Sequence, residues 1–238
     1  MACNATKQTN TKKPITNIDF IVNLTDTIRD LDSLRLFAWT GIQAELVMAQ
    51  ALQRDDKGGY NTSFVLNKPP MGMYYLGSSL QDLRPVFLGT EAKVVLTGSS
   101  TAINQLQIKD SPLNKEYAGL LDRLRKDNER GTRMNADFES TRANPTEQEK
   151  VKAQFLAHDQ EKKAYLDSLK KTGSELARIM AFNVFPSYQN HAAPGQTPGD
   201  YFATRFLEQV DVKDPVYMRV PINYENIMHY TSSLTVLK

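Results

Sequence analysis

The feature that most constrains the fold is a change in hydrophobic periodicity near residue 111. Before this point, short apolar runs alternate with polar residues and turn signals, a pattern typical of strands. After it, apolar residues recur every three or four positions among many charged side chains, as in amphipathic helices. A chain that changes period once is expected to place its strands and its helices in two successive regions.

The strand-like region contains eight short apolar runs, separated by turn signals. The runs lie at residues 18–22, 34–39, 45–52, 60–66, 71–77, 86–88, 93–97 and 105–108. Such spacing predicts an antiparallel β-sandwich or open barrel over residues 17–110. Trp39, the only tryptophan, is expected to pack between the sheets rather than to stack on a ligand.

The helical region is expected to begin at Ser111 and Pro112, a capping residue followed by a proline suited to the first turn. A second helix is predicted from Asn144 to Gly173, because its first residues form a variant of the capping box. Shorter helices are expected at residues 175–185, from residue 197 onward, and at 216–237. The chain is therefore predicted to be α+β, with residues 111–238 forming a helical domain or linker region.

Composition excludes several classes of function. The 29 Lys and Arg residues are interleaved with 27 Asp and Glu residues, so the chain lacks the basic footprint of a nucleic-acid-binding protein. No apolar stretch reaches the length of about 18 residues that a bilayer span requires. The single cysteine excludes an internal disulfide, a Cys-x-x-Cys redox pair and a cysteine zinc site within this sequence.

Cys3 is placed directly after Met1 and Ala2 and before a polar run. Two interpretations are open from the residues alone. The cysteine is either the lipidated residue of a processed lipoprotein or a chance cysteine in a cytoplasmic N-terminus. Residues 1–16 lack periodicity and are predicted to form a flexible tether.

No catalytic, cofactor-binding or metal-ligating constellation is predicted. His158, His191 and His229 fall on separate predicted elements without metal-ligand spacing, and His158 is expected to be a packing residue. Neither a Gly-rich phosphate loop nor a Gly-x-Ser-x-Gly elbow occurs. A group of aromatic residues could line a pocket where helices meet the sheet, although a core role is favoured. These residues are Tyr74, Tyr75, Phe182, Phe185, Tyr188, Tyr201, Phe202 and Phe206.

The layout resembles the N-terminal part of bacterial cell-envelope lipoproteins whose C-terminal half is a thioredoxin-like domain of the thiol–disulfide oxidoreductase type. In that family a β-sandwich closes with a strand, a glycine turn and a Ser-Pro-Leu-Asn segment that leads into a helix. The corresponding residues here are 85–89, 93–98 and 109–114. The proline-containing segment 211–234 is similar to the linker that precedes the family's thioredoxin fold, and the resemblance covers roughly residues 17–235.

The resemblance implies that Cys3 carries a lipid and that the protein lies in the bacterial cell envelope, touching the membrane only through this anchor. The catalytic Cys-x-x-Cys of the family has no counterpart here, so no active-site residue and no cofactor is carried over. The implied function is a non-catalytic accessory module that positions or docks partners for a thioredoxin-like domain outside this chain. The alternative is an independent envelope protein that binds a peptide or a glycan at the sandwich edge or in an aromatic groove.

The expected partners are the downstream thioredoxin-like domain and a second copy of this chain, bound through the C-terminal helices. Apolar side chains of the last segment are expected to be more exposed here than in a longer protein. These residues are Val216, Tyr217, Ile222, Ile227, Met228 and Tyr230.

Overall fold

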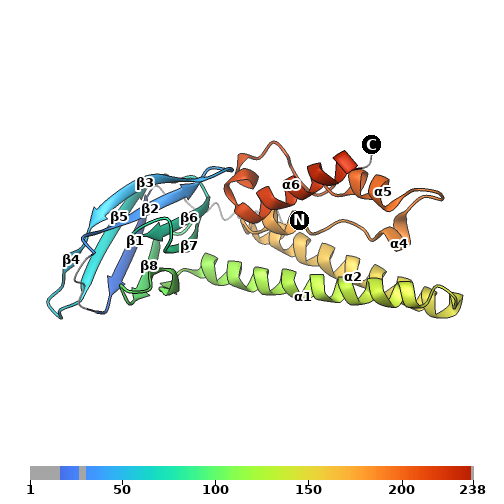
Figure 1. Ribbon diagram of the computed structural model, residues 1–238, viewed down its shortest axis with the longest axis horizontal. Helices are drawn as coiled ribbons and strands as arrows, with labels where there is room; N and C mark the ends of the chain where they lie inside the picture. Colours follow the sequence, from blue (N-terminus) through green and yellow to red (C-terminus); the bar gives the residue numbers. More distant parts are fainter. Residues whose placement is uncertain (1–16, 27–30, 237–238) are drawn as a thin grey trace, which may run out of the picture.

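The computed structural model describes residues 17–26 and 31–236, and it has the two regions expected from the sequence. The strands lie before Ser111 and the long helices after it, which confirms the α+β prediction. Figure 1 shows an elongated molecule, with the sandwich at one end and a helical region extending away from it. The predicted tether, residues 1–16, and Cys3 lie outside the described residues.

The N-terminal region is a sandwich of two sheets. Its strands are β1 (Asn17–Leu24), β2 (Ser33–Trp39), β3 (Ala44–Ala51), β4 (Gln53–Arg54), β5 (Tyr60–Asn67), β6 (Gly72–Gly77), β7 (Leu83–Leu88), β8 (Lys93–Gly98) and β9 (Gln107–Asp110). The order is β4-β5-β1-β8-β9 in one sheet and β3-β2-β6-β7 in the other. All pairs are antiparallel except β1 with β8, which run parallel. The short β4 was not predicted because it contains no apolar run.

Alternating side chains of the strands fill the space between the two sheets. Phe20 on β1 is paired with Phe64 on β5, and the two buried rings meet edge to face with their centroids 5.8 Å apart. Ile18 and Val22, two positions away on either side of Phe20, are buried in the same cluster. The alternation that predicted the strands therefore also identifies the core of the sandwich.

The placement of Trp39 between the sheets was wrong. Leu34 and Leu36 of β2 point into the sandwich core, and strand alternation turns Trp39 to the opposite face of this sheet. There it packs among residues of the helical region, with its ring 6.1 Å from that of Tyr224. The outer face of the four-stranded sheet is thus the face that the helices cover.

The helical region is built on a long antiparallel hairpin (Figure 1). Its helices are α1 (Pro112–Ser140), α2 (Pro145–Thr172), α3 (Ala177–Ala181), α4 (Tyr188–His191), α5 (Pro198–Arg205) and α6 (Pro221–Val236). The short 3-10 helices are η1 (Ile103–Gln105) and η2 (Pro215–Arg219). The predicted caps are confirmed, because the side chains of Ser111, Asn144 and Thr197 each accept a backbone hydrogen bond from the first turn that follows.

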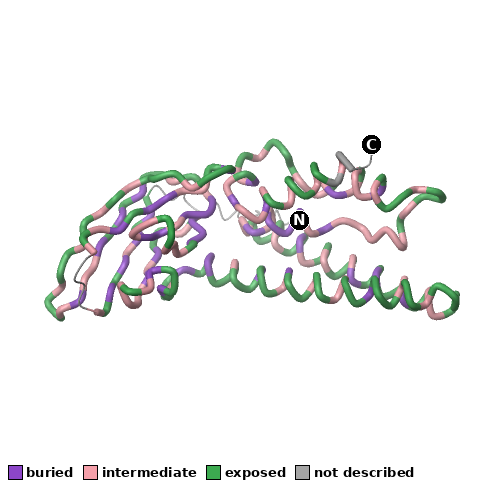
Figure 2. The backbone as a smooth tube through the Cα atoms, viewed as in Figure 1, coloured by how far each residue is buried: buried purple, intermediate pink, exposed green. Residues whose placement is uncertain are grey.

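The aromatic residues of the helical region form a core, as the sequence analysis favoured. Phe182, Phe206 and Tyr217 are buried together, with Phe202 and Tyr230 packed around them. The six C-terminal residues expected to be exposed differ in burial. Tyr217 is buried, whereas Met228 is 47% exposed. Figure 2 shows exposed residues along much of the outer side of α1 and buried ones where the elements face each other. None of the helices in the described part of the chain is long and apolar enough to cross a membrane.

Candidate functional site

The Ser-Pro-Leu-Asn segment lies at the junction between the sandwich and the helical hairpin. Ser111 caps α1, and its hydroxyl oxygen accepts a hydrogen bond of 3.1 Å from the backbone N–H of Asn114. Pro112 occupies the first helical position, where its missing N–H has no intrahelical partner to lose. Leu113 and Asn114 are both buried. The most distinctive segment of the sequence therefore begins the helix against the sheet.

Asn114 bonds the first turn of α1 to the edge of the four-stranded sheet. Its side-chain oxygen accepts a hydrogen bond of 2.7 Å from the backbone N–H of Phe87. Its side-chain nitrogen donates at 2.7 Å to the carbonyl of the same residue and at 2.7 Å to the Ser111 hydroxyl. Phe87 belongs to β7, the last strand of its sheet. The amide of Asn114 thus satisfies both backbone groups of Phe87, as a neighbouring strand would.

Glu91, in the loop between β7 and β8, secures the same turn from the other side. Its carboxylate accepts hydrogen bonds from the Ser111 hydroxyl at 2.5 Å and from the backbone N–H of Leu113 at 2.7 Å. Burial raises the pKa of Glu91 and the charge of Glu175 adds to the rise, while the two hydrogen bonds oppose it. We call Phe87, Glu91, Ser111 and Asn114 the junction clamp.

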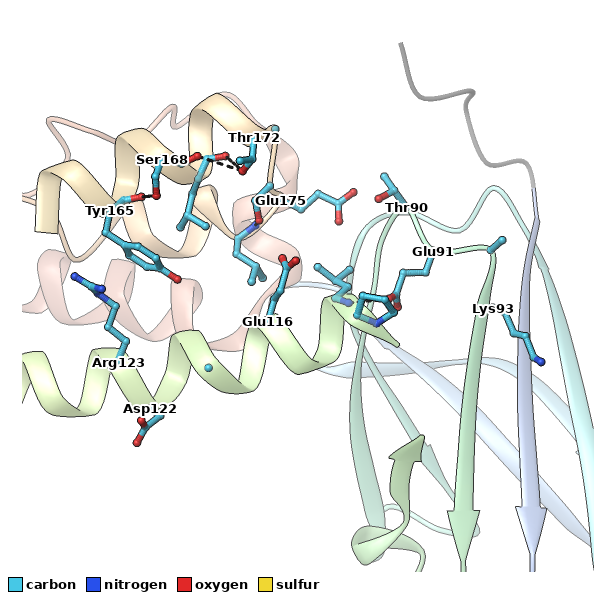
Figure 3. Close-up of a pocket in the computed structure, with 18 of the residues that line it drawn as sticks. Thr90, Glu91, Lys93, Glu116, Asp122, Arg123, Tyr165, Ser168, Thr172 and Glu175 are labelled. Carbon is cyan, nitrogen blue, oxygen red and sulfur yellow. Dashed lines mark hydrogen bonds between the residues drawn. The ribbon is translucent and has the colours of Figure 1, made fainter. Parts of the chain in front are cut away.

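The segment that follows α2 reaches the junction next to Gly89, with Glu175 as the contacting residue. A β-carbon at this position would lie 2.7 Å from a methyl carbon of Leu113 and would overlap the carboxylate of Glu175. Figure 3 shows that the Glu175 side chain extends toward Thr90, next to Gly89 in the chain. An alanine here would therefore require the ends of the Leu113 and Glu175 side chains to shift.

A cleft of about 980 Å3 opens beside the clamp, between the loop after β7, α1 and the end of α2. Glu116 points from α1 into this cleft, whereas Asp122 points away from it (Figure 3). Deeper along the hairpin, the guanidinium of Arg123 lies 4.0 Å from the centre of the Tyr165 ring. The charges around the cleft are of both signs, so it does not select strongly for one kind of ion.

Several polar groups of the cleft are bonded within the molecule. The hydroxyls of Ser168 and Thr172 donate to carbonyls of their own helix, at 2.7 and 3.2 Å. Glu91 is occupied by the clamp, and neither hydroxyl has a base beside it. Within residues 17–26 and 31–236, no group of three or more His, Cys, Asp or Glu residues is placed to hold a metal ion. The arrangement joins the sandwich to the helical hairpin.

The structure brings together one polar pair that sequence reasoning did not identify. His158 on α2 is 4% exposed, and its Nε2 lies 3.3 Å from a carboxylate oxygen of Asp127 on α1. Burial lowers the pKa of His158, and Asp127 opposes this shift, so the imidazole is neutral at pH 7. No hydroxyl or thiol of the described residues is bonded to His158, and the pair lacks a nucleophile. His158 is a packing residue, as predicted.

The other two histidines remain apart from this pair. His191 ends α4 and His229 lies on α6, and both are exposed. The three histidines therefore occupy separate elements, as the sequence indicated.

Comparisons with known proteins add little to this geometry. No family model matches the chain, and no curated protein matches it. Among solved structures, the carbohydrate-binding module CBMd (family CBM41) of Eubacterium rectale Amy13K is similar over 40% of this chain and 97% of that chain. The identity is 9% and the TM-score is 0.26, which is too low to support an argument about fold or function.

Proposed function

We propose that this chain is the non-catalytic accessory module of an envelope thiol–disulfide oxidoreductase lipoprotein. In this proposal it positions or docks partners for a thioredoxin-like domain outside the chain. The observation that supports it best is the junction clamp, in which Asn114 and Glu91 bond the hairpin to the sheet. A module that presents a partner gains from fixed geometry, because parts that must be ordered on binding lower the affinity.

The chemistry of the chain agrees with a supporting role. Cycling between dithiol and disulfide requires two thiols, and the sequence contains one cysteine. The junction cleft has no activated nucleophile among the residues described around it. In this proposal, the attached domain carries out electron transfer. This chain binds the partner and orients it.

The proposed location follows from the resemblance to envelope lipoproteins described in the sequence analysis. We propose that Cys3 is lipidated and anchors the protein in the bacterial envelope, either in the periplasm or at the outer membrane. Labelling cells with a radioactive fatty acid tests this directly. The wild-type protein should incorporate label and the Cys3→Ser variant should not, whereas equal incorporation by both proteins would contradict the anchor.

A second copy of the chain is also a proposed partner, through the C-terminal helices. Tyr217 is buried within the chain, so such a contact would use exposed side chains such as Met228 on α6. Light scattering at several concentrations should then show a dimer that the Met228→Lys substitution weakens. A monomer at every concentration would contradict this contact.

The accessory-module proposal is tested by the complete gene and its product. The reading frame should continue past Lys238 into a domain with a Cys-x-x-Cys motif. Deleting residues 17–236 from that longer protein should slow reduction of its native substrates while leaving reduction of a small disulfide unchanged. A gene that ends at Lys238, or reductase turnover by this chain alone, would overturn the proposal.

A further inference from the structure

A separate groove of about 500 Å3 lies on the open side of the sandwich, between β3 and β5. Its lining is mainly apolar and includes Val47, Met48, Val65, Leu66, Pro69 and Pro70. Val47 is 45% exposed and Val65 is 56% exposed, although both are large aliphatic residues. The size and the apolar lining are typical of sites that bind a ligand.

Two strand edges without a strand partner flank this groove. β3 is the last strand of its sheet. β5 pairs with β1 along its length, but on its other side only Tyr60 and Asn61 pair with β4. Within the described part of the chain, no strand pairs with the outer edge of β3 or with the outer edge of residues 62–67. Free backbone donors and acceptors beside an apolar groove are the elements used to bind an extended peptide.

Polar groups without partners lie at one end of the groove. Arg219 lines it, is partly buried, and forms no ion pair with any described residue. The indole nitrogen of Trp39 is buried and has no hydrogen-bond partner in the described structure. A buried donor without an acceptor is unfavourable, and a guanidinium is suited to bind a carboxylate. These two groups favour a ligand that brings acceptor oxygens and negative charge.

The loop that forms the wall of the groove is held in an unusual conformation. Lys68 has a φ of +45°, the only positive φ of a non-glycine residue in the described chain. The hydroxyl of Tyr74 donates a hydrogen bond of 2.8 Å to the carbonyl of Pro70 in the same loop. Strain of this kind persists where the surrounding structure fixes it, and it is concentrated at binding sites.

We propose that this groove binds an extended, apolar peptide segment that carries a carboxylate. The peptide would add to a free strand edge, its apolar side chains would cover Val47 and Val65, and its carboxylate would pair with Arg219. The inference rests on the proposed docking role and specifies the chemistry of the partner. A glycan is the competing ligand, and the experiment below separates the two.

The single tryptophan of the chain lies in the groove, so one indole N–H resonance reports directly on binding. The probe is a fluorescein-labelled peptide of alternating valine and threonine that ends in aspartate. A matched peptide with the same label ends in asparagine amide, so the two probes differ only in the carboxylates of the peptide itself. The aspartate peptide should shift the Trp39 indole resonance and bind about tenfold or more tightly than the amide peptide in fluorescence anisotropy.

Variants locate the site. Arg219→Gln should remove the preference for the aspartate peptide, and Val65→Lys should weaken binding of both peptides. Arg125→Gln is the matched control, because Arg125 pairs with Asp122 and Glu129 on the exposed side of α1. This control should leave affinity unchanged.

Three results would overturn the inference. They are the absence of binding at millimolar peptide, equal affinity for the two peptides, and a shift of the Trp39 resonance by a linear oligosaccharide alone. None of these results affects the gene-level test of the accessory module. A reading frame without a redox domain, in turn, would leave the peptide titration intact, so the two proposals can fail separately.

Discussion

Asn114 is the residue on which the junction depends most at the scale of single side chains. An amide carries an acceptor oxygen and a donor nitrogen side by side, so it can pair a backbone N–H and a backbone C=O of the same residue at once. Phe87 lies on a sheet edge, so without Asn114 its two backbone groups would be buried and unpaired. The energetic importance of the contact comes from the groups that its loss would leave unsatisfied.

Replacing this amide should therefore destabilise the whole chain. We expect Asn114→Ala to lower the free energy of unfolding by about 2–4 kcal/mol, measured by urea denaturation. Asn114→Asp should also lower it, because a carboxylate can accept from the Phe87 N–H but, when ionised, cannot donate to the Phe87 carbonyl. Asn128→Ala, an exposed position on the same helix, should have little effect. An Asn114→Ala variant as stable as Asn128→Ala would contradict the role of the clamp.

His158 should make stability depend on pH. Its pKa is lowered in the folded protein by burial, so the unfolded chain binds the proton first as pH falls. The contribution of His158 to stability is complete above its unfolded pKa of about 6.5 and is lost as pH falls through the folded pKa. Asp127 faces the ring and favours its protonation, whereas Lys162 and Arg130 oppose it.

The test is the free energy of unfolding between pH 8 and pH 5, for the wild type and for His158→Leu. The wild type should lose more stability on acidification than the variant, and the difference isolates this one group from other titrations. Parallel pH profiles for the two proteins would show that His158 does not titrate differently in the folded and unfolded states.

At the scale of elements, Gly89 leaves room for the side chains of Leu113 and Glu175 at the junction. Gly89→Ala should lower the free energy of unfolding by about 1–3 kcal/mol, because the added methyl group must displace Leu113 and Glu175. Combining it with Glu175→Ala should recover part of this loss, since one of the two obstacles is removed. Thermal or urea unfolding measures both effects.

Gly131 on α1 provides the matched control. A β-carbon there has no neighbour within 4 Å, and alanine favours the helix by about 0.5–1 kcal/mol. Gly131→Ala should therefore stabilise the protein. If Gly89→Ala has the same sign and size as Gly131→Ala, the close approach at the junction is not a structural requirement.

Elements were predictable where their signals are local. The eight apolar runs became strands, and Ser111, Asn144 and Thr197 begin helices, because alternation and capping act over a few residues. Trp39 was misplaced although the alternation with Leu34 and Leu36 already assigned it to the outer face. A large aromatic side chain packs against whichever apolar surface covers it, and for Trp39 this surface is the helical region.

The site itself was beyond local reasoning. The bond between Asn114 and Phe87 joins residues 27 positions apart, and the pair of His158 and Asp127 joins residues 31 positions apart. Each depends on how a helix docks on a sheet edge or on the register between two helices. The Ser-Pro-Leu-Asn segment is distinctive in the sequence. That it bonds the first turn of α1 to the sheet is visible only in the packed structure.

At the scale of the whole molecule, the sandwich and the helices share one hydrophobic cluster. Met73 and Phe87 of the sheet are buried together with Leu113 and Leu120 of α1. Ion pairs along the exposed side of α1 add little, since exposed pairs contribute about 0–1 kcal/mol each. Fixed geometry between the two regions therefore rests on the shared core and on the junction clamp.

Distances between spin labels on the two regions test this central claim most directly. Ser63→Cys on β5 and Ala136→Cys on α1 are exposed labelling positions, and Cys3→Ser removes the native thiol. Double electron–electron resonance should give one narrow distance distribution in this background and a broader one after Asn114→Ala. A broad or multiple distribution while Asn114 is intact would contradict a sandwich and hairpin held as one body.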